Sequence, residues 1–142
     1  SIKAENIALQ KTIDSINIEL AEQLSMLFKD HPIVIEIQTT KQNQNKTERE
    51  MFNLFIQYKG EKYASIDDMS GGEGDRASLA LTKAVWKITN SPFLMLDETL
   101  SGLDEVLYNE IVEGFQADTT HVPIFVIEHK SREGLFNHDI KF

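Results

Sequence analysis

The chain has 142 residues, of which 41% are hydrophobic, a formal net charge of −9 and no cysteine. This length suits one domain with a hydrophobic core, and the lack of thiols excludes disulfides and thiolate-bound metals. The acidic charge argues against a broad phosphate-binding face, because nucleic-acid affinity rests largely on lysine and arginine, and no apolar run approaches the roughly twenty residues of a membrane span.

The first part of the chain, residues 1–29, predicts a helix derived from a coiled-coil arm. Its apolar residues recur at alternating steps of four and three, which is the spacing of a heptad seam. The seam consists of Ile2, Leu9, Ile13, Ile16, Leu20 and Leu27. Asn6 and Gln23 are polar insertions in it. An amphipathic helix packed on the domain is the alternative, which Ile7 and Ile18 outside the seam favour, and both hold if an arm runs into the domain.

A small antiparallel β unit is expected next. The sequence Asp-His-Pro at 30–32 stops the helix, and β-branched residues at 33–37 predict a strand. Residues 51–58 predict a second strand, and 62–66 return after a turn at Lys59-Gly60-Glu61. The basic, polar stretch 41–49 between the first two strands is interpreted as an exposed connection, with a local basic patch as the alternative.

The second half of the chain alternates helices and strands. The expected elements are a helix from 71 to about 90, a strand at 93–96, a loop at 99–103, a helix from Asp104 to about 115, a strand at 122–128, a helical turn at 132–136 and a last strand at 139–142. Asp104 is a plausible N-cap. Such alternation predicts an α/β fold in which crossover helices connect a parallel sheet.

Two stretches carry residues suited to chemistry. Ser70 precedes Gly71 and Gly72 at the start of a helix, where free backbone N–H groups and the positive end of the helix dipole can receive an anion. An apolar strand delivers Asp97 and Glu98 to its carboxyl edge, where open α/β sheets bind ligands. The alternatives are a glycine turn that only begins a helix and two carboxylates that only cap a turn.

Taken together, these stretches resemble the C-terminal half of an ABC-type ATPase head. Residues 70–73 are similar to the family's signature motif, with Glu73 in place of the commoner glutamine. Residues 93–98 resemble Walker B with its adjacent catalytic glutamate, and 101–104 resemble the D-loop. His129 is similar to the switch histidine. The four motifs occur in the family's order, and their combination is far more specific than any one of them.

Within this class the chain most resembles the heads of SMC-like ATPases, especially the SbcC-type subunits of recombination nucleases and their phage relatives. Three features carry this resemblance: Glu73 with a following arginine, the run Ser-Leu-Ala-Leu at 78–81, and the preceding heptad helix. The resemblance implies that residues 1–29 are a returning coiled-coil arm and that 30–142 form the C-terminal lobe of a head. The chain holds no Gly-rich Lys-Ser/Thr phosphate loop, so we expect an N-terminal Walker A lobe of the same protein to complete it.

The resemblance also implies that two heads sandwich two ATP molecules. Ser70, Gly71, Gly72 and Glu73 would meet the γ-phosphate held by the partner head.

Further roles follow for the second stretch. Asp97 would hold Mg²⁺ and Glu98 would orient or deprotonate the attacking water. His129 would contact the γ-phosphate, and Ser101 and Asp104 of the D-loop would couple the two sites.

The function implied is ATP hydrolysis that closes paired heads and thereby controls a partner nuclease and the grip on double-stranded DNA. This activity would require both the N-terminal lobe and a second head. The alternatives are the nucleotide-binding domain of a membrane transporter and a non-catalytic pairing module. We expect an intracellular protein without membrane contact, in the cytoplasm, nucleoid or nucleus, or in the host cytoplasm if the parent is viral.

Overall fold

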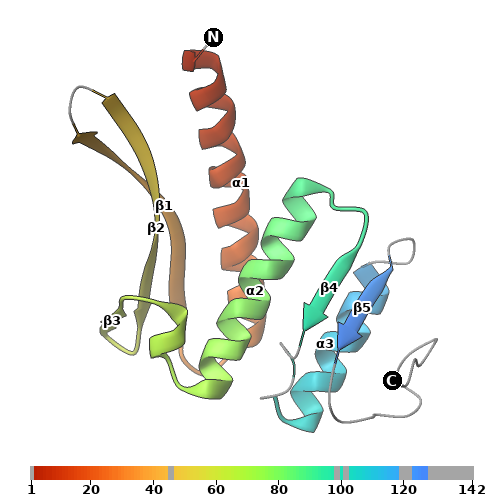
Figure 1. The fold of residues 1–142 in the computed structure, drawn as a ribbon. Helices are drawn as coiled ribbons and strands as arrows, with labels where there is room; N and C mark the ends of the chain where they lie inside the picture. The colour runs from red at the N-terminus through yellow and green to blue at the C-terminus, as the bar shows by residue number, and fades with distance from the viewer. Residues whose placement is uncertain (1, 45–46, 98–99, 101–102, 119–122, 128–142) are drawn as a thin grey trace. The chain divides into compact units, whose positions relative to one another are not determined.

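A computed structural model describes residues 2–44, 47–97, 100, 103–118 and 123–127 (Figure 1). The helices are α1 (Ile2–Leu27), α2 (Gly71–Thr89) and α3 (Glu105–Asp118), with a 3-10 turn η1 (Ile66–Asp68). The strands are β1 (Ile33–Gln44), β2 (Thr47–Tyr58), β3 (Glu61–Tyr63), β4 (Leu94–Asp97) and β5 (Ile124–Ile127). The chain divides into two compact units, residues 1–90 and 91–142. The elements predicted at 132–136 and 139–142 lie outside the described residues.

The first unit contains the expected antiparallel sheet, in the order β1-β2-β3. Strands β1 and β2 pair from Ile33 opposite Tyr58 to Gln44 opposite Thr47. The prediction of a polar connection at residues 39–50 is therefore wrong for residues 39–44 and 47–50, which extend both strands into a long hairpin. The sequence predicted a loop here because the side chains are polar. A ribbon needs few apolar side chains where neighbouring strands satisfy each other's backbone N–H and C=O groups.

A two-residue turn connects β2 to β3. Lys59 and Gly60 both have positive φ, 52° and 83°, which is the conformation of a type I′ hairpin turn. Gly60 tolerates this backbone at little cost because it lacks a Cβ. The returning strand is shorter than predicted and ends at Tyr63. Ile66, assigned to the strand from the sequence, instead begins η1.

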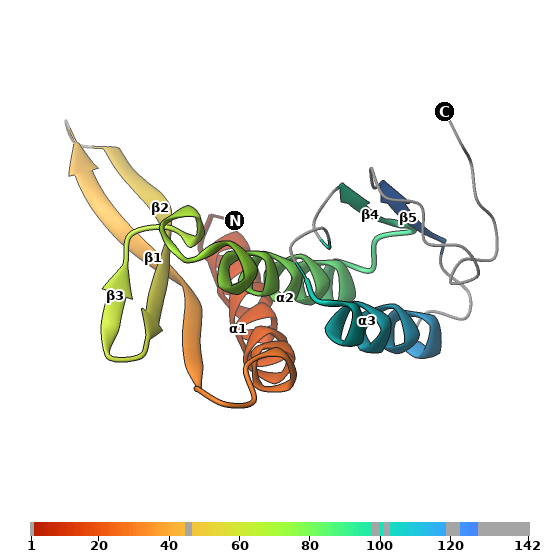
Figure 2. The same ribbon diagram turned by 90° about the horizontal axis from the view of Figure 1, so that it is seen from below.

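The core of the first unit lies between α1, α2 and the inner face of the sheet. Figure 2 shows the hairpin on one side of α1, with α2 packed against the same helix. The buried residues of this core are Ile16, Leu20, Leu24, Phe28, Ile33, Ile35, Ile56, Tyr58, Met69, Ala77, Ala80 and Ala84. The three alanines form the buried stripe of α2 and let α1 approach closely. Each fully buried leucine stabilises the unit by about 1.5–3 kcal/mol.

Helix α1 has two different halves. Residues 3–12 are all exposed, including Ile7 and Leu9, whereas burial begins at Ile13 and continues to Phe28. The C-terminal half is therefore a helix packed on the domain. The N-terminal half, which contains part of the heptad pattern, is exposed to solvent. Ile18 is 73% exposed, so it does not support packing as the sequence interpretation assumed.

A polar network joins α1 to α2. Gln23, predicted as a polar insertion in the seam, is buried and donates a hydrogen bond from Nε2 to Glu19 Oε1 at 2.7 Å. The same carboxylate oxygen forms an ion pair with Lys87 Nζ of α2, also at 2.7 Å. The buried amide thus has a partner, as burial of a polar group requires.

Asn17 ties α1 to the edge strand β1. Its Nδ2 donates to the carbonyl oxygen of Ile37 at 3.0 Å, and its Oδ1 accepts from the Ile37 N–H at 2.8 Å. The side-chain amide thereby satisfies the donor and the acceptor that a neighbouring strand would otherwise take. These two bonds fix α1 to the sheet midway along the helix.

The second unit confirms the predicted parallel pairing. Strands β4 and β5 are parallel, with Leu94 opposite Ile124 and Asp97 opposite Ile127. Leu94 and Leu96 are buried, whereas Met95 is 54% exposed. Among the described residues, the strand is therefore covered on one face only. The other large exposed side chains of this sheet region are Phe93, Phe125 and Ile127.

Helix α3 starts where the sequence predicts. Tyr108, Ile111, Val112 and Phe115 are buried on it at helical spacing. Throughout the described part of the chain, no helix is both long and apolar enough to cross a membrane.

Candidate functional site

The helix start that begins the signature stretch keeps its backbone donors uncapped. Ser70 is the N-cap of α2, with extended backbone angles of −61° and 150°, and its carbonyl oxygen accepts from the Gly74 N–H at 2.7 Å. Its hydroxyl makes no capping bond to the helix backbone. Instead Ser70 Oγ donates to Glu73 Oε2 at 2.6 Å. The N–H groups of the first turn therefore lack the side-chain acceptor that a serine cap usually supplies.

Packing on both sides fixes this turn. Met69 is buried in the core, and its N–H donates to the Ile66 carbonyl at 3.1 Å. A Cβ at Gly74 would lie 3.2 Å from the same carbonyl oxygen, so glycine allows η1 and α2 to approach closely. A Cβ at Gly71 would meet nothing within 4 Å. The lobe thus presents Ser70 and Gly71 on its open side.

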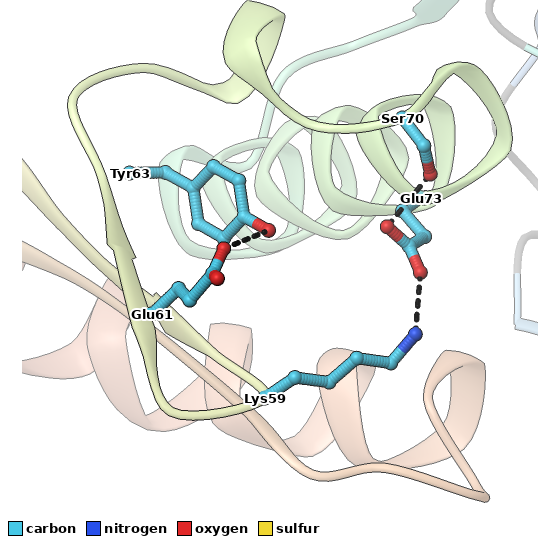
Figure 3. Close-up of polar contacts among 5 residues, drawn as sticks. All are labelled: Lys59, Glu61, Tyr63, Ser70 and Glu73. Carbon is cyan, nitrogen blue, oxygen red and sulfur yellow. Dashed lines mark hydrogen bonds and ion pairs between the residues drawn. The ribbon is translucent and has the colours of Figure 1, made fainter.

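Lys59 is a charged neighbour of this stretch that the sequence interpretation missed. Its Nζ lies 3.0 Å from Glu73 Oε1, while the other carboxylate oxygen accepts from Ser70 (Figure 3). The Ser70 hydrogen bond, followed by Lys59, lowers the pKa of the Glu73 carboxyl. The Glu73 carboxylate in turn raises the pKa of Lys59. The β2–β3 turn places Lys59 beside Glu73, and no local motif in the sequence indicates this contact.

The same hairpin contributes other polar contacts at this end of the unit. Tyr63 donates from its hydroxyl to Glu61 Oε2 at 3.5 Å (Figure 3). The Lys59 ammonium lies 4.8 Å from the centroid of the Tyr58 ring. Lys59 thus rests on an aromatic face while it reaches Glu73.

The guanidinium of Arg76, on the same helix, lies over the Phe28 ring, 4.8 Å from the centroid. Its buried Nε has no hydrogen-bond partner among the residues that the structure describes. This cation–π contact links the signature helix to the end of α1.

The Walker B-like carboxylates are only partly within the described residues. Asp97 is the last residue of β4 and pairs with Ile127 of β5, so its backbone lies at the carboxyl edge of the parallel pair as predicted. The Asp97 side chain is not described, and Glu98, Ser101 and His129 lie outside the described residues. Their roles therefore remain predictions.

Asp104 is confirmed as an N-cap. Its Oδ1 accepts from the Leu107 N–H at 2.9 Å, and its carbonyl oxygen accepts from the Tyr108 N–H at 2.9 Å. Leu100 and Leu103 are buried. The described part of the D-loop-like segment, residues 103–104, is thus held by an apolar side chain and by the cap.

The described residues fit an anion better than a resident metal. The uncapped first turn of α2 and the open space at Gly71 suit a phosphate that approaches the backbone. Within the described ranges, no three His, Cys, Asp or Glu side chains gather to hold a metal ion. The expected Mg²⁺ ligand, Asp97, falls where no side chain is described.

Comparison with known proteins relates the chain to viral and bacterial sequences. A relative named Uncharacterized protein 050L, from Invertebrate iridescent virus 6, is 33% identical over an alignment of 147 positions, which covers 97% of this chain and 14% of that protein. The chromosome partition protein Smc of Clostridium kluyveri is 30% identical over 144 residues, 86% of this chain and 11% of that protein. The chain therefore spans only a small part of the length of these relatives. No family model matches it.

Solved structures with the same fold are heads of SMC proteins. A structure described as the Smc head bound to the C-winged helix domain of ScpA has a TM-score of 0.68 and 18% identity, covering 91% of this chain and 38% of that one. A structure from work on ATP-driven dimerization and DNA-stimulated activation of SMC ATPases has a TM-score of 0.61 and 18% identity, covering 87% and 73%.

The chain therefore has the fold of the C-terminal portion of an SMC head, with an N-terminal helix, a small antiparallel sheet and a parallel pair of strands with helices.

Proposed function

We propose that this lobe binds ATP held by a partner head and takes part in its hydrolysis when the head is complete. The observation that carries the proposal is the geometry at Ser70. An uncapped helix start, a hydroxyl and an open Gly71 backbone lie together on the accessible side of the lobe. These are the groups that a γ-phosphate needs, because N–H groups and the helix dipole both favour an anion.

The nucleotide site would be completed by an N-terminal Walker A lobe of the same protein. The sequence contains no phosphate loop of its own. The exposed apolar side chains at β4 and β5 support this proposal, because a sheet face of this kind normally packs against another element. We place the N-terminal lobe there, and a second head opposite Ser70.

The catalytic groups would come from the carboxyl edge of the parallel sheet. Mg²⁺, when bound, would neutralise phosphate charge. Asp97 would hold the ion, and Glu98 would accept a proton from the attacking water or orient it. His129 would hydrogen-bond the γ-phosphate. The register supports this grouping, since Asp97 is paired with Ile127, two residues before His129.

The D-loop-like segment would couple the two sites of a closed dimer. Ser101 is flanked in the sequence by Leu100 and Leu103, which are buried, and Asp104 caps α3. These described neighbours can transmit a change at one head to the other, because buried residues do not move independently of the core.

We further propose that the whole protein works on DNA inside the cell or, for a viral parent, in the host cytoplasm. The exposed first half of α1 supports a coiled-coil arm and disfavours a membrane transporter. The leading setting is a repair or recombination complex in which head closure controls a nuclease subunit and double-stranded DNA. A second candidate is chromosome partition with a ScpA-like partner. The similarity to a chromosome partition protein Smc and to an Smc head bound to ScpA favours it.

The test is steady-state ATPase activity of the full-length protein, with and without linear double-stranded DNA. We expect DNA-stimulated turnover that Glu98→Gln abolishes while ATP binding persists. ATPase activity that is the same with and without DNA would contradict the DNA-processing role. Complete inactivity would contradict the ATPase assignment and favour the pairing module.

A further inference from the structure

The glutamate in the signature stretch creates an electrostatic difficulty. Glu73 lies one helical turn from Ser70, and its carboxylate Oε2 accepts a hydrogen bond from the Ser70 hydroxyl at 2.6 Å. A negative charge so close to the proposed phosphate position repels the ligand that Ser70 and the helix start attract. The commoner glutamine would carry no such charge.

The hydroxyl of Ser70 also has only one proton to donate. It cannot donate to Glu73 and to a phosphate oxygen at the same time. Anion binding at Ser70 Oγ therefore requires the 2.6 Å bond to Glu73 to break. After that step the Lys59 ammonium at 3.0 Å is the partner that the described residues leave in direct contact with the Glu73 carboxylate.

We propose that Lys59 is a positioning residue for nucleotide binding, which neutralises and holds Glu73 so that Ser70 can exchange its carboxylate partner for the γ-phosphate. The inference rests on the function proposed above and adds to it a residue from outside the four motifs. The Lys59 charge offsets the Glu73 charge, and the I′ turn fixes the ammonium where the carboxylate needs it.

The backbone explains why this position is well defined. Lys59 is the first residue of the two-residue turn, with φ of 52°, and the strands on either side are in register at Tyr58 and Glu61. The lowered pKa of Glu73 and the raised pKa of Lys59 agree with a charged pair. Lys62, on the same hairpin, instead lies over the Phe55 ring at 5.5 Å from its centroid, and it therefore offers a matched control.

The experiment measures head pairing of the full-length protein by sedimentation velocity, as a non-hydrolysable ATP analogue is added with Mg²⁺. We expect Lys59→Met to raise the analogue concentration for half-maximal pairing roughly fivefold, and Lys59→Arg to remain near the parental value. Lys62→Met removes the same charge from the same hairpin and should change it less than about twofold.

The decisive variant combines Lys59→Met with Glu73→Gln. If Lys59 acts through the Glu73 charge, Glu73→Gln removes the need for it, and the double variant should pair within about twofold of Glu73→Gln alone. A role in hairpin stability only would leave the defect of Lys59→Met in place. Equal melting temperatures of Lys59→Met and Lys62→Met would show that both fold.

The outcomes separate this inference from the function on which it rests. If the parental protein pairs with the analogue and Ser70→Arg prevents it, but Lys59→Met pairs normally, the Lys59 inference is overturned and the proposed function stands. A defect that Glu73→Gln fails to rescue overturns it as well. If the parental protein does not pair with the analogue, both the proposed function and the inference fail.

Discussion

Replacing Gly71 with alanine separates what the signature turn needs to fold from what it needs to bind nucleotide. Gly71 is the first residue of α2, and a methyl group there would contact no atom within 4 Å. Its φ does not lie in the left-handed region, so alanine can adopt its backbone conformation. Alanine also lowers the entropy of the unfolded chain. We therefore expect Gly71→Ala to stabilise the lobe by about 0.4–1 kcal/mol.

The same methyl group should damage nucleotide binding. It would project into the open space from which a phosphate reaches the backbone N–H groups, where glycine permits a close approach. We expect ATP-dependent pairing to weaken by about tenfold or more, which corresponds to at least about 1.4 kcal/mol. Urea unfolding and sedimentation velocity of the full-length protein measure the two effects.

Gly60→Ala is the matched control because it should show the opposite pattern. Gly60 has a φ of 83° in the β2–β3 turn, where a Cβ is strained at a cost of about 1–2 kcal/mol. We expect lower stability, and a change in pairing no larger than the roughly fivefold change expected for Lys59→Met, because the same turn positions Lys59. The reasoning is refuted if Gly71→Ala unfolds at lower urea than the parent, or if it pairs at the parental ATP concentration.

Three further predictions concern single contacts. Asp104→Ala removes the α3 cap and should destabilise the protein by about 1 kcal/mol in urea unfolding; no change would contradict the cap. Asn17→Ala removes two bonds to the Ile37 backbone and should cost about 1–3 kcal/mol, with faster amide exchange at Ile37 as the specific readout. The contribution of the Lys59–Glu73 pair should be lost as pH falls through the lowered pKa of Glu73, below its usual 4.5, or rises through the raised pKa of Lys59, above 10.5. Between these limits the stability difference between parent and Lys59→Met should be flat, and a step near neutral pH would contradict it.

The sequence predicted the elements that carry strong periodic or motif signals. The helix of residues 2–27, the turn predicted at 59–61, the helix after Ser70 and the parallel pairing of β4 with β5 agree with the structure, which narrows the turn to Lys59 and Gly60. Asp104 was also correctly predicted as a cap. Each of these features depends on local spacing or local backbone preference, which a single sequence records directly.

The failures have a common physical origin in contacts between distant parts of the chain. In the polar stretch 41–49, residues 41–44 and 47–49 continue two strands because each backbone satisfies the other's hydrogen-bonding groups, which the side chains do not reveal. Leu24 is buried although it lies outside the predicted seam, because α2 and the sheet, not a second coiled-coil helix, decide which face of α1 is covered. Lys59 reaches Glu73 only through the hairpin register.

The central claim is that Ser70 and the start of α2 receive ATP from a partner head. The most direct measurement is the sedimentation of the full-length Glu98→Gln protein with Mg²⁺ and ATP, with and without the additional substitution Ser70→Arg. We expect ATP-dependent dimers that Ser70→Arg abolishes while each head still binds ATP. Dimers that form equally in the presence of Ser70→Arg would contradict it.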